Sequence, residues 1–367
     1  MQNGRSGALA FAPAPLLEVK NLSVDYLAAN GTVHALTDVS ISLARGQILG
    51  LAGESGSGKT TLGYAITRLL RPPAVITGGT LLYYPATGEP VDILQLTPPQ
   101  LRAFRWNTLA IVFQSAMNAL NPVLTLGTQI EDVLRYHRPE MNREQRRARV
   151  VELLKLVGIA PDRIRSYPHE LSGGMRQRSI IAMALALSPE IVIMDEPTTA
   201  LDVVVQREIL TELIRLREQL SFSIIFITHD LSLLLELADT IAIMYAGRVV
   251  ETATCRQLQS QPRHPYSYGM LHSFPSLHGP RQRMTGIPGS PPDLRSAPSG
   301  CAFHLRCPFA ISACSEVLPT LQHPTESMLD QLVACHMYNP ALTGPDLPTN
   351  ADFAQGYEAA YATRKRR

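Results

Sequence analysis

The sequence predicts an α/β domain built on a buried parallel sheet, followed by a small loop-rich domain that holds a cluster of cysteines. The runs "EIVIMDE" and "FSIIFITHD" are rich in Ile and Val without polar alternation, which is typical of strands covered on both faces. A third apolar run, "GQILGLAG", leads directly into glycines. In contrast, residues 262–308 are dense in proline, and four of the five cysteines lie between 301 and 335, which favours loops over regular elements.

These shifts in pattern divide the chain into four segments. We expect a flexible lead at 1–16, the α/β domain at 17–255, a C-terminal extension at 256–340 and a tail at 341–367. Only one modest helical region, "NREQRRARVVELLKLVGI", is evident between the glycine-rich stretch and the middle of the domain. Its apolar residues recur at helical spacing and Gly158 ends it.

Composition restricts the class of protein. Apolar residues make up 45% and charged residues 17%, and the net charge is only +2, so no broad surface for a polyanion such as nucleic acid is expected. The most apolar stretch, "SIIAMALALSPEIVIMDE", is interrupted by Pro189 and is too short on either side to span a bilayer. We therefore expect a cytosolic protein whose contact with a membrane would come through a partner.

The stretch "GESGSGKTT" fits the phosphate-binding pattern G-x-x-x-x-G-K-[ST]. A predicted strand (Ile48–Ala52) precedes it and a predicted helix (Thr61–Leu70) follows, as this type of loop requires. Glycines allow backbone N–H groups to converge on phosphate oxygens at a helix N-terminus, Lys59 supplies positive charge, and the Thr60 hydroxyl is suited to bind Mg²⁺. The candidate ATP-contacting residues here are Gly53, Glu54, Ser55, Gly56, Ser57, Gly58, Lys59, Thr60 and Thr61.

The run "IVIMDE" supplies two carboxylates at the end of a buried strand. Asp195 would lie at the carboxyl edge of the sheet, where it can hold Mg²⁺, and Glu196 would face the terminal phosphate as a general base for water. A merely solvated pair of acids is the alternative, but the phosphate-binding pattern disfavours it.

Further stretches resemble those of ABC-type ATPases, which have a P-loop nucleotide-binding fold with a helical subdomain, here at about 115–180. "LSGGMRQR" resembles the signature motif, "TTALD" the D-loop, "THD" the switch-histidine segment and "IVFQ" the Q-loop. The resemblance implies that Ser172, Gly173 and Gly174 close on ATP held by a second subunit, since two such domains pair head to tail.

The same resemblance assigns roles to single residues. It implies that Asp202 belongs to the D-loop, that His229 senses the terminal phosphate and that Gln114 contacts Mg²⁺ and the nucleotide. Tyr26 stands where the family places an aromatic that stacks on adenine, although a strand tyrosine packed on its neighbours remains the alternative.

Within this family the chain resembles the ATPase subunits of oligopeptide and dipeptide importers, over residues 16–338 and in such stretches as "HPYSYGMLHSFP" and "GIPGSPPDL". "NPVLTLG" looks like the first, or D-type, of two non-identical ATPases. This implies a translocating ATPase at the cytoplasmic face of a bacterial or archaeal membrane. Its partners would be a second ATPase, two permeases and, indirectly, an extracytoplasmic binding protein. A homodimer of ATPases, and a cargo of nickel or short oligosaccharides, stay open.

Two other classes of ATPase use similar motifs. DNA-repair and chromosome ATPases carry long coiled coils or zinc modules between the phosphate loop and the signature, and translation-associated ABC proteins need two nucleotide domains in one chain. The sequence contains neither feature, so we favour the importer.

The remaining question is the role of Cys301, Cys307, Cys314 and Cys335. A segment this small rarely folds without a metal or a cross-link, and disulfides are uncommon in the cytosol. The gaps are wider than those of ordinary zinc pairs, whereas four thiolates suit an iron–sulfur cluster. The importer resemblance implies a 4Fe–4S centre held by these four residues; zinc and unmetallated thiols remain alternatives. Cys255 stands apart as a plain thiol.

Overall fold

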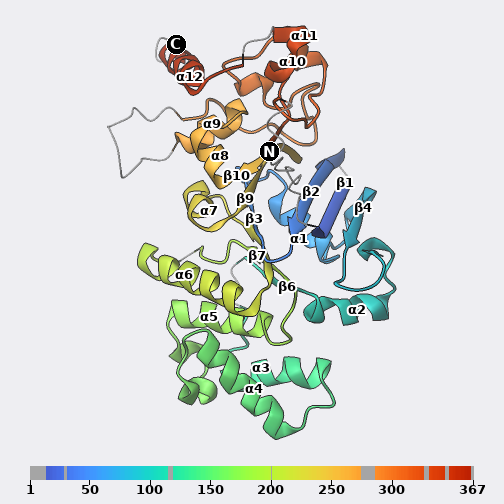
Figure 1. The fold of residues 1–367 in the computed structure, drawn as a ribbon, viewed down its shortest axis with the longest axis vertical. Coiled ribbons are helices and arrows are strands. Elements are labelled where there is room, and N and C mark those ends of the chain that lie inside the picture. Colours follow the sequence, from blue (N-terminus) through green and yellow to red (C-terminus); the bar gives the residue numbers. More distant parts are fainter. Residues whose placement is uncertain are drawn as a thin grey trace, which may run out of the picture.

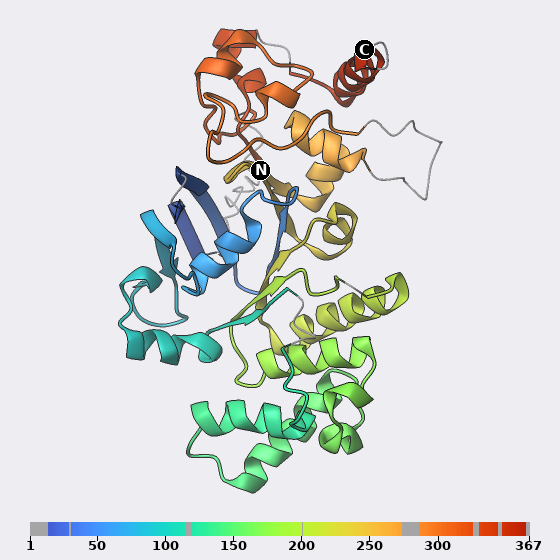
Figure 2. The ribbon, with the colours of Figure 1, turned by 180° about the vertical axis from the view of Figure 1, so that it is seen from behind.

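The computed structural model describes residues 14–28, 31–114, 119–199, 201–273, 286–325, 330–343 and 347–364. They form two sheets, several layers of helix and a C-terminal extension (Figure 1). The helices α3 and α4 lie at one end of the long axis and the extension at the other, as both side views show (Figures 1 and 2). The predicted α/β fold is therefore confirmed.

A seven-stranded sheet forms the centre, in the order β11-β10-β9-β3-β8-β7-β6. The pairs β6–β7, β7–β8, β8–β3 and β3–β9 are parallel, while β10 and β11 continue the sheet antiparallel. Its strands are β3 (Ile48–Ala52), β6 (Leu109–Val112), β7 (Ile191–Asp195), β8 (Ser223–Ile227), β9 (Thr240–Tyr245), β10 (Arg248–Thr254) and β11 (Leu332–Val333).

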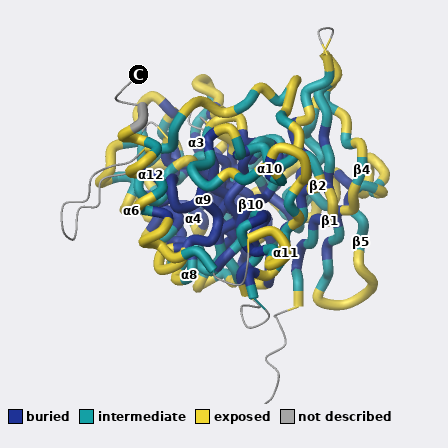
Figure 3. Tube along the Cα trace, turned by 90° about the horizontal axis from the view of Figure 1, so that it is seen from above, coloured by how far each residue is buried: buried dark blue, intermediate teal, exposed yellow. Residues whose placement is uncertain are grey.

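Alternate residues of the central strands face two different cores. Ile224 and Phe226 of β8 face the helical layer, whereas Ile225 and Ile227 face the second sheet. Burial on both faces explains why these strands are continuous apolar runs in the sequence. Seen along the long axis, buried residues occupy the interior and exposed segments surround them (Figure 3).

The second sheet is antiparallel, in the order β2-β1-β4-β5, and it covers one face of the central sheet together with the helix α1. Its strands are β1 (Pro15–Ala28), β2 (Gly31–Ala44), β4 (Ala74–Tyr83) and β5 (Val91–Asp92), and α1 spans Lys59–Ile66.

Helices cover the other face. They are α3 (Leu126–His137), α4 (Arg143–Leu156), α5 (Gly173–Ala184), α6 (Val203–Leu220) and α7 (Leu231–Leu237). The helix α2 (Pro98–Asn107) packs beside the antiparallel sheet. None of the described helices is both long and apolar enough to cross a lipid bilayer.

The extension is attached to the central sheet and does not form a separate body. It contributes β11, which pairs with β10, and Phe303, which is fully buried in the core of the helical layer. Its helices are α8 (Cys255–Ser260), α9 (Pro265–Leu271) and α10 (Ser312–Glu316), and the tail that follows contains α11 (Pro340–Thr343) and α12 (Asn350–Arg364).

Several boundaries differ from expectation. The strand predicted at Ile48–Ala52 is observed, but the helix after the phosphate loop is Lys59–Ile66 and not Thr61–Leu70, because Arg68 has a left-handed backbone (φ 52°). Three helices, α2 to α4, occupy the interval in which one helical region was evident. Of the flexible lead predicted at 1–16, residues 1–13 lie outside the described residues. Pro15 and Leu16 belong to β1.

The tail also differs. Residues 350–364 form α12, whose Phe353 and Tyr357 are buried against Tyr268 of α9 and Phe309. The sequence contained no evident apolar stripe there, because only two residues anchor this helix. The last residues of the basic end "TRKRR", 365–367, lie outside the described residues.

Candidate functional site

The phosphate loop joins β3 to α1 at the carboxyl edge of the central sheet. Gly53 has φ 150° and Gly58 has φ 102°. A Cβ atom added at Gly53 would lie 2.2 Å from the carbonyl oxygen of Met244. A Cβ atom added at Gly58 would lie 2.7 Å from the carbonyl oxygen of Ala35. Backbone conformation and space therefore both require glycine at these two positions. At these two positions the loop presents only its backbone to a ligand.

Lys59 is buried at the start of α1 and folds back on the loop. Its Nζ donates to the carbonyl oxygens of Gly53 (2.7 Å) and Glu54 (3.0 Å). Burial lowers the pKa of this ammonium, while the carboxylates of Glu196, Asp195 and Glu54 oppose the shift. The positive charge is thus held in place by carbonyl oxygens that a phosphate could replace.

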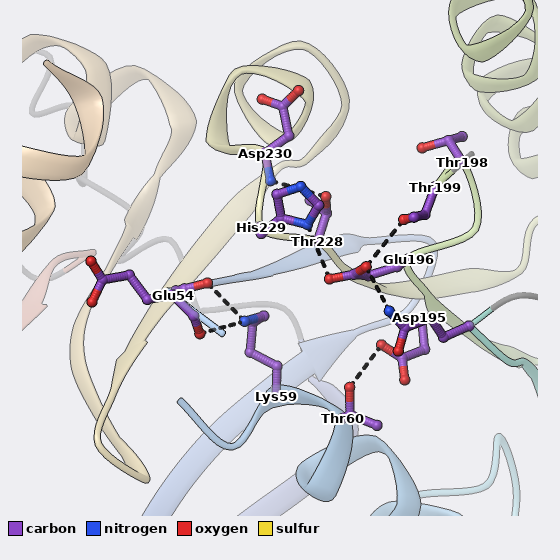
Figure 4. Close-up of polar contacts among 12 residues, drawn as sticks. Glu54, Lys59, Thr60, Asp195, Glu196, Thr198, Thr199, Thr228, His229 and Asp230 are labelled. Carbon is purple, nitrogen blue, oxygen red and sulfur yellow. Dashed lines mark hydrogen bonds and ion pairs between the residues drawn. The ribbon is translucent and has the colours of Figure 1, made fainter. Parts of the chain in front are cut away.

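Asp195, the last residue of β7, lies beside Thr60. The Thr60 hydroxyl donates to Asp195 Oδ1 (3.1 Å; Figure 4), and Oδ2 is buried without a hydrogen-bond partner among the described residues. Burial raises the pKa of Asp195. A buried carboxylate oxygen without a partner, next to a hydroxyl, has the donor chemistry that Mg²⁺ and its water ligands require, so these residues fit the ion.

Glu196 follows Asp195 in a left-handed backbone conformation, with φ 47°. Three side chains donate to its carboxylate: Gln114 (2.9 Å), Thr199 (3.1 Å) and His229, whose Nδ1 lies 3.1 Å away. Burial raises its pKa, but the bonds from His229 and Thr199 and the charges of His229 and Lys59 outweigh burial and hold the pKa below its ordinary value. The carboxylate is therefore kept ionised and aimed at the space above Lys59 (Figure 4).

Part of this group lines one cavity of about 350 Å³. Its lining includes the phosphate loop from Ser55 to Thr61, Gln114 and Glu196, together with Tyr26, Val33 and Ala35. The predicted residues Gly53, Glu54, Asp195 and His229 lie behind or beside these and are not in the described lining. The Tyr26 hydroxyl lies 3.5 Å from Thr61 Oγ1. The polar phosphate loop suits the phosphates of a nucleoside triphosphate, and the aromatic and aliphatic side chains suit its base.

The signature residues lie elsewhere. Ser172 caps α5 by accepting from Met175 N (3.2 Å), and Asp202 caps α6 by accepting from Val204 N (3.1 Å) and Val205 N (3.0 Å). Ser172, Gly173 and Gly174 are not among the described residues that line the cavity. This chain brings together the predicted site residues of the phosphate loop and strand ends, but it does not bring the signature to them.

Sequence reasoning missed two residues of the site. Thr199 lies within the "TTALD" stretch, and its role as a donor to Glu196 depends on the turn after β7. Leu294, in the extension, lines the same cavity. No local pattern marks Leu294, because only the packing of the extension brings it there.

The four clustered cysteines line a second, small cavity together with His264, Phe303, His304, Phe309 and His336. Burial raises the pKa of the Cys301, Cys307 and Cys335 thiols, that of Cys307 to about 12. All five cysteines are free thiols, and among the described residues no three His, Cys, Asp or Glu side chains are already arranged to hold a metal ion. Two of the histidines bond backbone carbonyl oxygens, His304 Nδ1 that of Cys301 and His336 Nε2 that of Val317, each at 2.8 Å. His264 Nδ1 instead accepts from the Tyr266 N–H (3.0 Å).

Comparisons with known proteins agree with this geometry. Residues 36–199 match the family described as "ABC transporter", and residues 250–314 match "Oligopeptide/dipeptide transporter, C-terminal region". The oligopeptide transport ATP-binding protein OppD of Bacillus subtilis is 43% identical over 83% of this chain and 85% of its own length. A protein of Brucella abortus that carries a provisional assignment as a peptide import ATP-binding protein is 45% identical over 85% of this chain and 93% of its own.

Solved structures give the same result. The ATP-binding cassette MJ0796, in a dimeric post-hydrolysis state bound to ADP and phosphate, is 29% identical, with a TM-score of 0.57 over 65% of this chain and 99% of that one. The protein cbiO1 of Clostridium perfringens, part of an ABC transporter complex, is 27% identical, with a TM-score of 0.57 over 66% and 90% of the two chains. The chain therefore belongs to the ABC transporter family, among the ATP-binding subunits with an oligopeptide/dipeptide transporter C-terminal region, and it is an ATPase.

Proposed function

We propose that this chain hydrolyses ATP to power a membrane importer of the oligopeptide and dipeptide class. The observation that carries the proposal is the ionised Glu196, oriented by three donors at the edge of a cavity whose floor is a glycine-rich loop with a buried lysine. The likeness to peptide-transport ATPases over most of the chain supports the cargo class.

Within this site each residue has a distinct role. The phosphate loop binds the phosphates with backbone N–H groups from Ser55 onward, since the N–H of Glu54 is bound to the Tyr266 hydroxyl. Lys59 exchanges its carbonyl partners for phosphate oxygens. Thr60, Asp195 and Gln114 hold Mg²⁺, which neutralises phosphate charge when bound. Tyr26 stacks on adenine.

Glu196 accepts a proton from the attacking water, and its low pKa keeps it in the basic form at neutral pH. Gln114 and Thr199 donate to one carboxylate oxygen and His229 contacts the other, so the carboxylate cannot rotate freely. His229, through its contact with Glu196, acts as the sensor of the terminal phosphate.

The signature residues Ser172, Gly173 and Gly174 act on ATP held by a neighbouring ATPase subunit. They stand at the start of α5, where Ser172 is exposed, and a helix N-terminus can bind an anion. Asp202, also exposed, stands at the start of α6. The partner is a second, non-identical ATPase, and the pair drives two permeases from the cytoplasmic face of the membrane, fed from outside by a binding protein.

We further propose that the four clustered cysteines hold a 4Fe–4S cluster. The donor set fits, because the four thiols line one small cavity, and four cysteine thiolates are the usual ligands of such a cluster. A metal cluster would convert the thiols to thiolates. The cluster would anchor the extension at 256–340 to the ATPase domain at 17–255, leaving the helical tail at 341–367 beyond it. Iron content and visible absorbance after anaerobic purification test the proposal; protein that holds zinc, or no metal, would contradict it.

Uptake by cells of the native host tests the function. Deletion of the gene should abolish the uptake of labelled di-, tri- and pentapeptides, and the intact gene should restore it. A gene carrying Lys59→Ala should not, since its product cannot bind the phosphates. Loss of nickel or oligosaccharide uptake, with peptide uptake unchanged, would contradict the peptide class.

A further inference from the structure

A residue of the C-terminal extension reaches into the phosphate loop. Arg306 lies in a short 3₁₀ turn, His304–Arg306, between two of the clustered cysteines. Its guanidinium forms two bonds to the Glu54 carboxylate, from Nη1 to Oε2 (2.6 Å) and from Nη2 to Oε1 (3.0 Å). Glu54 is the second residue of the phosphate loop. This paired geometry is the strongest that an arginine and a carboxylate can adopt.

The Arg306 side chain is held rigidly and is only 6% exposed. Its Nε donates to Pro288 O (2.7 Å) and its Nη1 also donates to the Tyr245 hydroxyl (3.2 Å). The guanidinium lies over the rings of Tyr245 (5.7 Å) and Phe303 (5.9 Å). A guanidinium fixed by so many partners imposes its position on Glu54, and not the reverse.

The extension also holds the main chain of Glu54. The Glu54 N–H donates to the hydroxyl of Tyr266 in α9 at 2.8 Å, and Tyr266 is fully buried. The N–H is therefore bound by the extension, while the Glu54 carbonyl oxygen accepts from Lys59. A displacement of Glu54 would consequently move one of the two carbonyl partners that position the lysine.

The contact between Arg306 and Glu54 also changes the charge of the phosphate loop. The Glu54 carboxylate points away from the cluster of Lys59 and Glu196 (Figure 4), but it remains close enough to act on the charge of Lys59. Without a cation beside it, a carboxylate in the phosphate loop would repel a triphosphate. Arg306 is the cation that the structure supplies.

We propose that Arg306 and Tyr266 are positioning residues for ATP, through which the C-terminal extension sets the conformation of the phosphate loop and neutralises Glu54. The proposal rests on the nucleotide site described above. It makes the extension part of the ATPase machinery, and it assigns to the segment between Cys301 and Cys307 a role that is independent of any metal.

The test measures the dissociation constant of AMP-PNP with Mg²⁺ for the full-length chain by calorimetry. Arg306→Ala should raise this constant about tenfold, and Tyr266→Phe about threefold, as expected for one lost hydrogen bond. Glu54→Gln alone should have a smaller effect than Arg306→Ala. The double variant Glu54→Gln/Arg306→Ala should bind more tightly than Arg306→Ala, because the uncompensated carboxylate is gone; a purely structural role of Arg306 would not produce this recovery.

Arg295→Ala is the matched control, since Arg295 lies in the same extension but pairs with its exposed neighbour Asp293, and it should bind as the unaltered chain does. Arg306→Gln, which removes the charge but keeps more of the side chain, covers the case in which Arg306→Ala does not fold, and it too should bind more weakly. Unaltered binding by either Arg306 variant, or a double variant as weak as Arg306→Ala, would overturn the proposal. Failure of the unaltered chain to bind more tightly than Lys59→Ala would instead refute the nucleotide site itself.

Discussion

The nucleotide cavity and the cysteine cavity are both lined by reactive side chains, but the two surroundings have opposite effects on the ionisation of those side chains. In the first, Lys59 and Glu196 have hydrogen-bond partners within the chain, and the Glu196 carboxylate has its pKa held low. In the second, four thiols line one small cavity, and burial raises the pKa values of Cys301, Cys307 and Cys335. Burial with hydrogen-bond donors in place keeps a carboxylate charged, whereas burial without a neighbouring cation favours the neutral form of a thiol.

The first variant tests the prepared site. Glu196→Gln keeps the shape and removes the base, so ATP turnover should fall about 10²–10⁴-fold, while ATP binding changes little. Steady-state phosphate release with the partner subunits measures it. Glu190→Gln is a control, because Glu190 lies at the opposite end of β7 and pairs with Arg45 and Tyr83. Equal turnover in the two variants would remove Glu196 from its role.

The second variant tests the thiol cavity. Cys307→Ser should reduce bound iron from about four atoms per chain, the content of a 4Fe–4S cluster, to background, and it should lower the thermal midpoint because the metal is coupled to folding. Cys255→Ser is the matched control, since Cys255 donates to the Ala238 carbonyl oxygen far from the other four. Iron retained in full by Cys307→Ser would contradict the assignment.

A third variant examines the apolar wall of the nucleotide cavity. Tyr26→Ala should weaken ATP binding by about 1–3 kcal/mol, the range for stacking of a base on an aromatic ring. Tyr26→Phe keeps the ring and loses only the long 3.5 Å contact to Thr61, so it should bind almost normally. Equal binding by Tyr26→Ala and Tyr26→Phe would mean that the ring does not contact adenine.

The smallest effect concerns pH. Thr199→Val removes a donor that lowers the pKa of Glu196, so the acidic limb of the turnover profile should move to higher pH by about 0.4–1 unit, the equivalent of one hydrogen bond. A lowered carboxyl pKa stabilises the fold only above the pKa of the unfolded chain, and this contribution disappears as pH falls through the folded value. A profile identical to that of the unaltered chain would show that Thr199 does not act on Glu196.

The nucleotide site was more predictable than the extension for a reason that particular residues illustrate. Gly53 and Gly58 have backbone angles in one loop that favour glycine. Asp195 ends a strand that is recognisable as buried from its own run of apolar residues. Such local requirements leave a contiguous pattern. Leu294 and Thr199, which the sequence did not indicate, contribute through turns and packing that no short pattern encodes.

By itself, the sequence determined that this is an α/β ATPase with a phosphate loop and a pair of acids at a strand end, because each of these depends on residues close together in the chain. Only the tertiary structure decided that α12 docks through Phe353, that four separated cysteines line one cavity and that Arg306 grips Glu54. These contacts join segments up to 252 residues apart, and their formation depends on the packing of the whole chain and not on local preference.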